Sequence, residues 1–322
     1  MRTRELRARR REAYTLIELL IVISIIAILA GLTLAGVMKV LGKKPEVQTT
    51  DEMKQMDGAV QQFMTKYDAK YVPSQIKLAY MYTNTTYPNV GVAGSLDDES
   101  VRFITQTIGK NEQTFVNKWK TTGIQWAPGM TANDVVTLEG HQCLVFFLGG
   151  IQTSSNGVIS CNGFNPDPLN AGVPPAPGQG IGPFFQFDSK RLSIPPGKKY
   201  FAAYEDPYGK KQYYAYFSAF HGKSNDYNHF GGSDCASLLQ PQGLWPYAAS
   251  AKAAGAPIQY VNKNSWQIIC AGADGKFGPG TNLSGAAGVT PYYWNKNTAG
   301  QIPADGGDDQ ANFASGKLQF GE

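Results

Sequence analysis

Three acidic residues near the C-terminal end have the types and surroundings that could bind a metal ion. Asp274 lies in the glycine-rich stretch 268–282, and Asp308 and Asp309 lie in a second glycine-rich stretch at 305–313. Hard cations such as Ca²⁺ take six to eight oxygen ligands, which carboxylates and backbone carbonyls supply. The spacing is not that of an EF-hand. These residues therefore predict either a calcium site or a simple turn at Asp274 and Gly275.

The cysteines and histidines suggest structural roles. None of the cysteines forms a CxxC pair, and the three histidines show no zinc-like spacing with them. The cysteines are Cys143, Cys161, Cys235 and Cys270. An even number in an exported domain allows two disulfides, and proximity in sequence favours Cys143–Cys161 and Cys235–Cys270. The alternative is that some are buried free thiols.

Catalytic chemistry is not indicated. The sequence contains no G-x-S-x-G, H-E-x-x-H, P-loop or G-x-G-x-x-G pattern in a suitable context. His141, His221 and His229 are scattered along the chain. We therefore expect a protein that is not an enzyme.

The charge of the protein is concentrated at its N-terminus. Six of the 29 basic and two of the 25 acidic residues lie in the first 13 positions, so the rest carries 23 of each. A neutral body removes the electrostatic support for a nucleic-acid partner. With 42% hydrophobic and 17% charged residues, 36 Gly and 19 Pro, the composition is that of a globular protein with many turns.

An apolar segment at 14–41 follows the basic residues and contains one carboxylate, Glu18. No charge occurs from Leu19 to Met38, and about 20 helical residues span the roughly 30 Å hydrocarbon core of a membrane. The basic leader predicts a cytoplasmic N-terminus and an external C-terminal body. A secretory signal peptide would be shorter. An ordinary membrane anchor has no reason to carry the costly Glu18.

Residues 13–22, AYTLIELLIV, resemble the prepilin signal of type IV pilins and type II secretion pseudopilins. The resemblance implies that a prepilin peptidase cuts after Ala13 and that Tyr14 becomes the N-methylated first residue. It also implies that Glu18 faces the amine of Tyr14 in a neighbouring subunit during fibre assembly. Such an ion pair in an apolar core contributes register more than stability.

Two features depart from that family's pattern. The family usually has Gly at the position of Ala13. Many members also have a helix-loosening Pro where this chain has Ala35, flanked by Gly31 and Gly36. Each Gly lowers helix stability by about 1 kcal/mol relative to Ala, so these glycines can soften the helix in the same way.

A second resemblance lies in the C-terminal half. The sequence Asp206-Pro-Tyr-Gly, a tyrosine-rich segment, G-A-D-G-K-F-G and D-D-x-x-N-F together resemble the major pseudopilin of type II secretion. The resemblance implies calcium bound by Asp274, with Asp308 or Asp309 as the second ligand. The chain departs from the family through about 25 residues, 283–307, inserted within the short family loop.

We expect an α+β pilin fold, in which a long N-terminal helix packs on an antiparallel sheet. Its domains would be a leader at 1–13, a transmembrane and fibre-core helix at 14–41 and an exported head at 42–322. An amphipathic helix resumes after Pro45, with Thr49 or Thr50 as its N-cap. Its apolar stripe is expected at Met53, Met56, Val60, Phe63, Met64 and Tyr67. Further helices are expected at 97–120 and 131–148, and loops at 75–95 and 151–182. Strands are expected at 184–187, 200–204, 212–217 and 266–271.

The predicted function is that of a structural subunit of a secretion pseudopilus. Its partners would be further copies in a helical fibre, the prepilin peptidase, minor pseudopilins and the assembly platform of the inner membrane. We expect a single pass through the inner membrane with the head in the periplasm or outside. The alternatives are a surface pilin for adhesion, motility or DNA uptake, and a membrane-tethered binding module that does not assemble.

Overall fold

The computed structural model describes residues 15–239, 241, 243–249, 259–278, 280 and 307–314. The chain divides into two compact units, Met1–Pro45 and Glu46–Glu322. The helices are α1 Leu16–Tyr67, α2 Leu96–Gln106, α3 Gln113–Thr121 and α4 Gly140–Gly149, with 3₁₀ turns η1 Pro168–Asn170, η2 Ser189–Arg191 and η3 Phe220–Gly222. The strands are β1 Ile76–Ala79, β2 Val135–Leu138, β3 Gln152–Ser155, β4 Val158–Cys161, β5 Leu192–Ser193, β6 Ala203–Tyr204, β7 Ala215–Ser218, β8 Ala248–Ala249, β9 Gln259–Tyr260, β10 Trp266–Cys270 and β11 Gln310–Ala311.

Helix α1 runs without interruption through Pro45. The expectation that a new helix begins at Thr49 or Thr50 is therefore wrong. Proline removes one backbone hydrogen bond, but its fixed φ is itself helical, so neighbouring turns can carry the helix across it. Thr50 donates its hydroxyl to the carbonyl of Glu46 at 3.0 Å, one turn back, so it serves as an interior helix residue.

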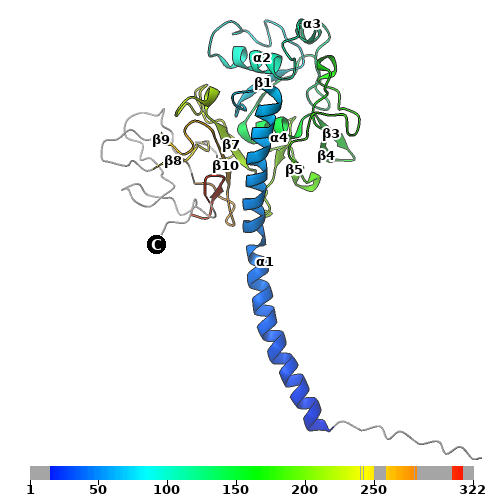
Figure 1. The fold of residues 1–322 in the computed structure, drawn as a ribbon, viewed down its shortest axis with the longest axis vertical. Helices are drawn as coiled ribbons and strands as arrows, with labels where there is room; N and C mark the ends of the chain where they lie inside the picture. Colours follow the sequence, from blue (N-terminus) through cyan, green and yellow to red (C-terminus); the bar gives the residue numbers. More distant parts are fainter. Residues whose placement is uncertain are drawn as a thin grey trace, which may run out of the picture. The chain divides into compact units, whose positions relative to one another are not determined.

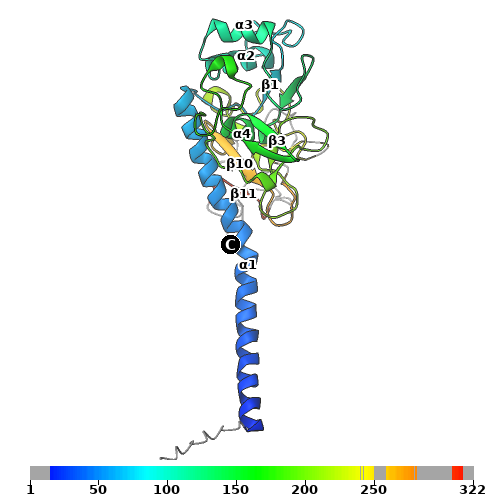
Figure 2. The ribbon, with the colours of Figure 1, turned by 90° about the vertical axis from the view of Figure 1, so that its right-hand side faces the viewer.

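The part of α1 within the second unit buries the predicted apolar stripe. Met53, Met56, Val60 and Phe63 are each no more than 2% exposed. Figure 1 shows this part of the helix beside β7 and β10, and Figure 2 shows it along one side of the unit. Polar contacts add to the apolar packing, because Asp57 accepts a hydrogen bond from the indole nitrogen of Trp266 in β10 at 2.8 Å.

The strands form small antiparallel sheets. The largest has three strands in the order β11-β10-β7, and it pairs Trp266 with Ser218 and Ile269 with Ala311. Two-stranded pairs join β1 to β2, β3 to β4, β5 to β6 and β8 to β9. An apolar N-terminal helix followed by helices and antiparallel sheets is the mixed α+β arrangement of a pilin-like fold. The predicted fold class is confirmed.

Two of the expected helices are divided differently. The predicted helix 97–120 is two helices, α2 and α3, because Lys110 and Asn111 adopt left-handed φ values of 49° and 60° that no α-helix can contain. The predicted helix 131–148 is strand β2 followed by α4. The β-branched residues 135–137 favour a strand, and Glu139 begins α4 with a capping box to Gln142.

Several expected strands are shorter or absent, and two expected loops contain strands. No strand covers 184–187, and the segments 200–204, 212–217 and 266–271 reduce to β6, β7 and β10. The segment 75–95 contributes β1, and 151–182 begins with the hairpin β3–β4. Aromatic runs favour strands, but here most of the aromatic rings fill the core from short strands and irregular segments.

The predicted disulfides do not form in this structure. All four cysteines are free thiols. Cys143, Cys235 and Cys270 are fully buried, and burial raises the pKa of each thiol. They behave as small apolar core residues, which is a common role for cysteine.

Candidate functional site

The N-terminal site is built on the first turn of α1. Thr15 precedes the helix, and its backbone N–H and hydroxyl both donate to Oε2 of Glu18 at 2.9 Å. The N–H of Glu18 donates back to the Thr15 hydroxyl at 3.3 Å. This reciprocal capping box satisfies two of the N–H groups that a helix start leaves without partners. Ala13 and Tyr14, the predicted processing residues, lie outside the described residues.

The next turns of α1 form a segment able to cross a membrane. Residues 16–33 have a mean hydropathy of 2.7, and none of that stretch is buried inside the structure. The hydroxyls of Ser24 and Thr33 donate to the carbonyls of Leu20 and Leu29, one turn earlier. These hydroxyl groups therefore find their hydrogen-bond partners within the helix, as a lipid environment requires of polar groups.

The second candidate site lies where the two parts of the C-terminal resemblance meet. The turn that begins at Asp206 is closed by the N–H of Tyr208, which donates to Asp206 Oδ1 at 3.0 Å. The thiol of Cys270, at the end of β10, donates to Asp206 Oδ2 at 3.6 Å. Tyr208 donates its hydroxyl to Gln310 in β11 at 2.7 Å. Burial raises the pKa of Asp206 to about 6.

The acidic residues of this site have different surroundings. Asp274 and Asp308 are adjacent, since the N–H of Asp274 donates to Asp308 Oδ2 at 2.9 Å. Asp309 instead points into the core and is fully buried. Its Oδ2 accepts hydrogen bonds from the Tyr247 hydroxyl and the N–H of Gly278. Burial raises the pKa of Asp309 well above its usual value.

The donors here are oxygens, which suits a hard cation. Asp309 Oδ1 is buried and has no hydrogen-bond partner, so a cation could occupy that side of the carboxylate. Within the described ranges, however, no three histidine, cysteine or acidic side chains are grouped to hold a metal. The remaining ligands of any ion would have to be backbone carbonyls, glycine-turn carbonyls in particular.

Sequence reasoning missed a cavity at the C-terminal end of α1. Glu99, almost fully buried, contacts Arg102 on the same helix and His221 of η3. The spacing of Glu99 and Arg102, three residues apart on a helix, was readable from the sequence. The approach of His221, 122 residues away, was not.

In the described residues, the N-terminal helix is long and apolar enough to fit a single-pass membrane anchor, and an α+β body follows it. The prokaryotic N-terminal methylation motif matches residues 8–34. The chain thus carries the prepilin-type signal of type IV pilins and pseudopilins, which indicates a structural subunit processed by prepilin peptidase and assembled at the membrane. Comparison with curated proteins gives no match, and comparison with solved structures gives none either.

Proposed function

We propose that this chain is a pseudopilin that assembles into a helical fibre of the type II secretion kind and drives protein secretion. The observation that carries the proposal is the apolar segment 16–33, which has no buried side chains within the monomer yet begins with a carboxylate at Glu18. A membrane accounts for the apolar side chains. A fibre core that supplies a cationic partner accounts for both the side chains and the carboxylate.

The mechanism of this function is mechanical. Cleavage after Ala13 would release the amine of Tyr14, and that amine in one subunit would pair with Glu18 of its neighbour. Glu18 is available for this role because both hydrogen bonds from Thr15 go to Oε2. The N–H and hydroxyl of Thr15 can also form hydrogen bonds with other acceptors. The pair sets the axial register, while the burial of apolar helices provides cohesion. Minor pseudopilins and the inner-membrane platform would add subunits, with each head in the periplasm.

The test compares the wild type with Glu18→Ala and with Asp51→Ala, which removes an exposed carboxylate from the same helix outside the apolar segment. After overexpression, sheared and cell-associated fractions are examined by electron microscopy and intact-mass spectrometry. We expect filaments of chains that begin at Tyr14 and carry one methyl group. Asp51→Ala should assemble normally, whereas Glu18→Ala should be cleaved but remain in the membrane.

Two results separate this proposal from its alternatives. A surface pilus would be identified instead by two observations together. The wild type would shed filaments into the medium, and a strain that lacks the protein would still secrete normally. Absence of wild-type filaments would leave only a membrane-tethered module. Normal assembly of Glu18→Ala would instead refute the role proposed for Glu18 in fibre assembly.

We propose in addition that calcium binds at the C-terminal loop through Asp274 and Asp308, with Asp309 Oδ1 as a further oxygen. The support is the direct contact between Asp274 and Asp308 and the partnerless buried oxygen of Asp309. When bound, the ion would neutralise clustered carboxylates and hold the loop against β11. Asp309 is already fixed by Tyr247, so its contribution does not require the side chain to move.

A further inference from the structure

A cavity of about 320 Å³ lies between the C-terminal end of α1, helix α2 and η3, all within the second unit. The residues around it are Tyr67–Tyr71 at and just after the end of α1, four residues of α2 between Glu99 and Gln106, the C-cap Thr107 and His221. Figure 1 shows α2 next to this end of α1. A volume of that size holds about ten water molecules, which is the scale of one sugar ring.

The side chains at its centre are held in place by the rest of the fold. Glu99 is 7% exposed and contacts Arg102 and His221, with His221 Nε2 3.1 Å from Glu99 Oε2. His221 adopts a left-handed φ of 52° and stacks on Phe220, with ring centroids 4.1 Å apart. A buried carboxylate with two partners and a strained, stacked histidine make a rigid polar centre.

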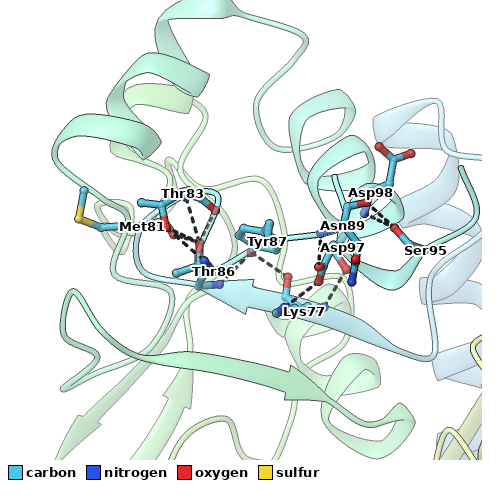
Figure 3. Close-up of polar contacts among 11 residues, drawn as sticks. Lys77, Met81, Thr83, Thr86, Tyr87, Asn89, Ser95, Asp97 and Asp98 are labelled. Atoms are coloured by element: carbon cyan, nitrogen blue, oxygen red, sulfur yellow. Dashed lines mark hydrogen bonds and ion pairs between the residues drawn. The ribbon is translucent and has the colours of Figure 1, made fainter. Parts of the chain in front are cut away.

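Helix α2 is itself anchored near its N-terminus. Asp97 forms an ion pair with Lys77 of β1 at 2.7 Å and accepts a hydrogen bond from the N–H of Asn89 at 3.0 Å. Ser95 caps the helix by accepting from the N–H of Asp98. Figure 3 shows these contacts between β1, the following loop and the start of α2. They fix the register of Glu99 and Arg102 less than two turns further along.

The walls combine apolar rings with spare hydrogen-bonding groups. Tyr71 packs edge-to-face on Phe103 and on His221, with centroids 5.7 and 4.9 Å apart. Arg102 is 45% exposed and bonds Glu99 through Nη2, which leaves the donors on Nη1 and Nε for a ligand. Gln106 adds an exposed amide that can donate and accept hydrogen bonds.

The charges around the cavity cancel. Asp68 and Glu99 are balanced by Lys70 and Arg102. Burial lowers the pKa of His221 and so favours the neutral form of its ring. The cavity therefore provides no net attraction for an ion. It suits a neutral ligand with many hydroxyl groups to donate and accept hydrogen bonds and with C–H faces to lie on aromatic rings.

We propose that this cavity binds one ring of a neutral saccharide. The ring would lie against Tyr71 and Phe103, while its hydroxyl groups would bond Arg102, Gln106 and the carboxylate of Asp68. Such a site would let the head of an assembled subunit contact a glycan. The proposal is the same whether the fibre is a secretion pseudopilus or a surface pilus.

The test uses the full-length protein in lauryldimethylamine oxide, because detergents with sugar headgroups would compete. Galactose, mannose and N-acetylglucosamine are each tested by saturation-transfer NMR and titrated by calorimetry. Glutamate and choline serve as the anionic and cationic comparators. We expect at least one sugar to bind at millimolar concentration. Binding of glutamate or choline with no sugar binding would overturn the proposal, as would absence of binding by all five compounds.

Variants place the binding in this cavity. Gln106→Ala and Arg102→Gln should each weaken sugar binding by about tenfold, the size expected for losing one hydrogen bond or more from a charged donor. Lys190→Ala, an exposed cation outside the cavity, should bind as the wild type does. Because Arg102→Gln removes a partner of buried Glu99, its melting temperature is measured in parallel. If Gln106→Ala and Arg102→Gln both fold and both bind the sugar as tightly as the wild type does, the sugar binds elsewhere. That result would refute the assignment of the cavity.

Discussion

Breaking the ion pair between Glu52 and Arg191 tests how α1 is held to the body of the second unit. The two side chains are 12% and 15% exposed and form a two-pronged contact, Nη1 to Oε1 at 2.5 Å and Nη2 to Oε2 at 2.9 Å. Tyr214 donates its hydroxyl to Glu52 at 2.7 Å. Burial opposes the charge of Arg191, but Glu52 outweighs it and raises the pKa of the guanidinium.

The two single variants are expected to be costly and the double variant much less so. Glu52→Leu leaves Arg191 buried with only the Glu205 carbonyl and the Tyr204 ring as partners. Arg191→Met leaves Glu52 to Tyr214 and Gln48. Removing one partner of a buried pair costs roughly 3–5 kcal/mol, and incomplete burial here favours the lower figure of about 3 kcal/mol. For a unit of this size, that lowers the melting temperature by roughly 6–12 °C.

The assay is urea and thermal unfolding of the purified full-length protein, followed by tryptophan fluorescence in detergent. The double variant should lie within about 2 kcal/mol of the wild type, because no charge is left buried without a partner. Lys190→Met, next to Arg191 but exposed, should change stability by less than about 0.5 kcal/mol. If the losses of the two single variants simply add in the double variant, the side chains are not coupled and the reasoning fails.

Three further predictions concern the buried acids, the thiols and the C-terminal loop. Burial raises the pKa of Asp234 to about 7, so the folded state binds its proton between pH 4 and 7. Stability should therefore fall as pH rises through that window, by roughly 4 kcal/mol at most, and Asp234→Asn should flatten the profile measured by urea unfolding. A thiol assay should find four reactive thiols after unfolding without reductant and almost none before it, whereas two or none after unfolding would indicate disulfides. Calcium at about 100 times its dissociation constant should stabilise the protein by about 2.7 kcal/mol relative to chelator, and Asp308→Asn should reduce this, whereas equal melting curves would exclude the site.

The apolar N-terminal helix and its prepilin-type motif could be predicted because they depend on local sequence. The apolar run, the leader and Glu18 lie within about 40 consecutive residues, and a helix satisfies its own backbone, so no distant partner had to be known. The stripe of Met53, Met56, Val60 and Phe63 was likewise readable from its period. The predicted helix 97–120 is interrupted at Lys110 and Asn111. A left-handed turn is a local exception that the spacing of apolar residues does not reveal.

The acidic loop shows the intermediate case. The sequence brought Asp274 and Asp308 into one hypothesis, and the structure places them in contact. It could not show that Asp309, the next residue, is buried in the core and accepts a hydrogen bond from Tyr247. Asp308 lies in a turn and Asp309 directly precedes β11, so which of the two is buried depends on how β11 pairs with β10.

The sequence alone determined that this chain carries a prepilin-type signal on an apolar N-terminal helix, because that information is carried by residue type along a continuous segment. The tertiary structure alone decided that the four cysteines are free thiols. It also decided the contacts of Glu52 with Arg191 and of Glu99 with His221. Each of those contacts joins residues far apart in the chain. Their meeting depends on how helices and short strands pack to fill the core, which no local pattern specifies.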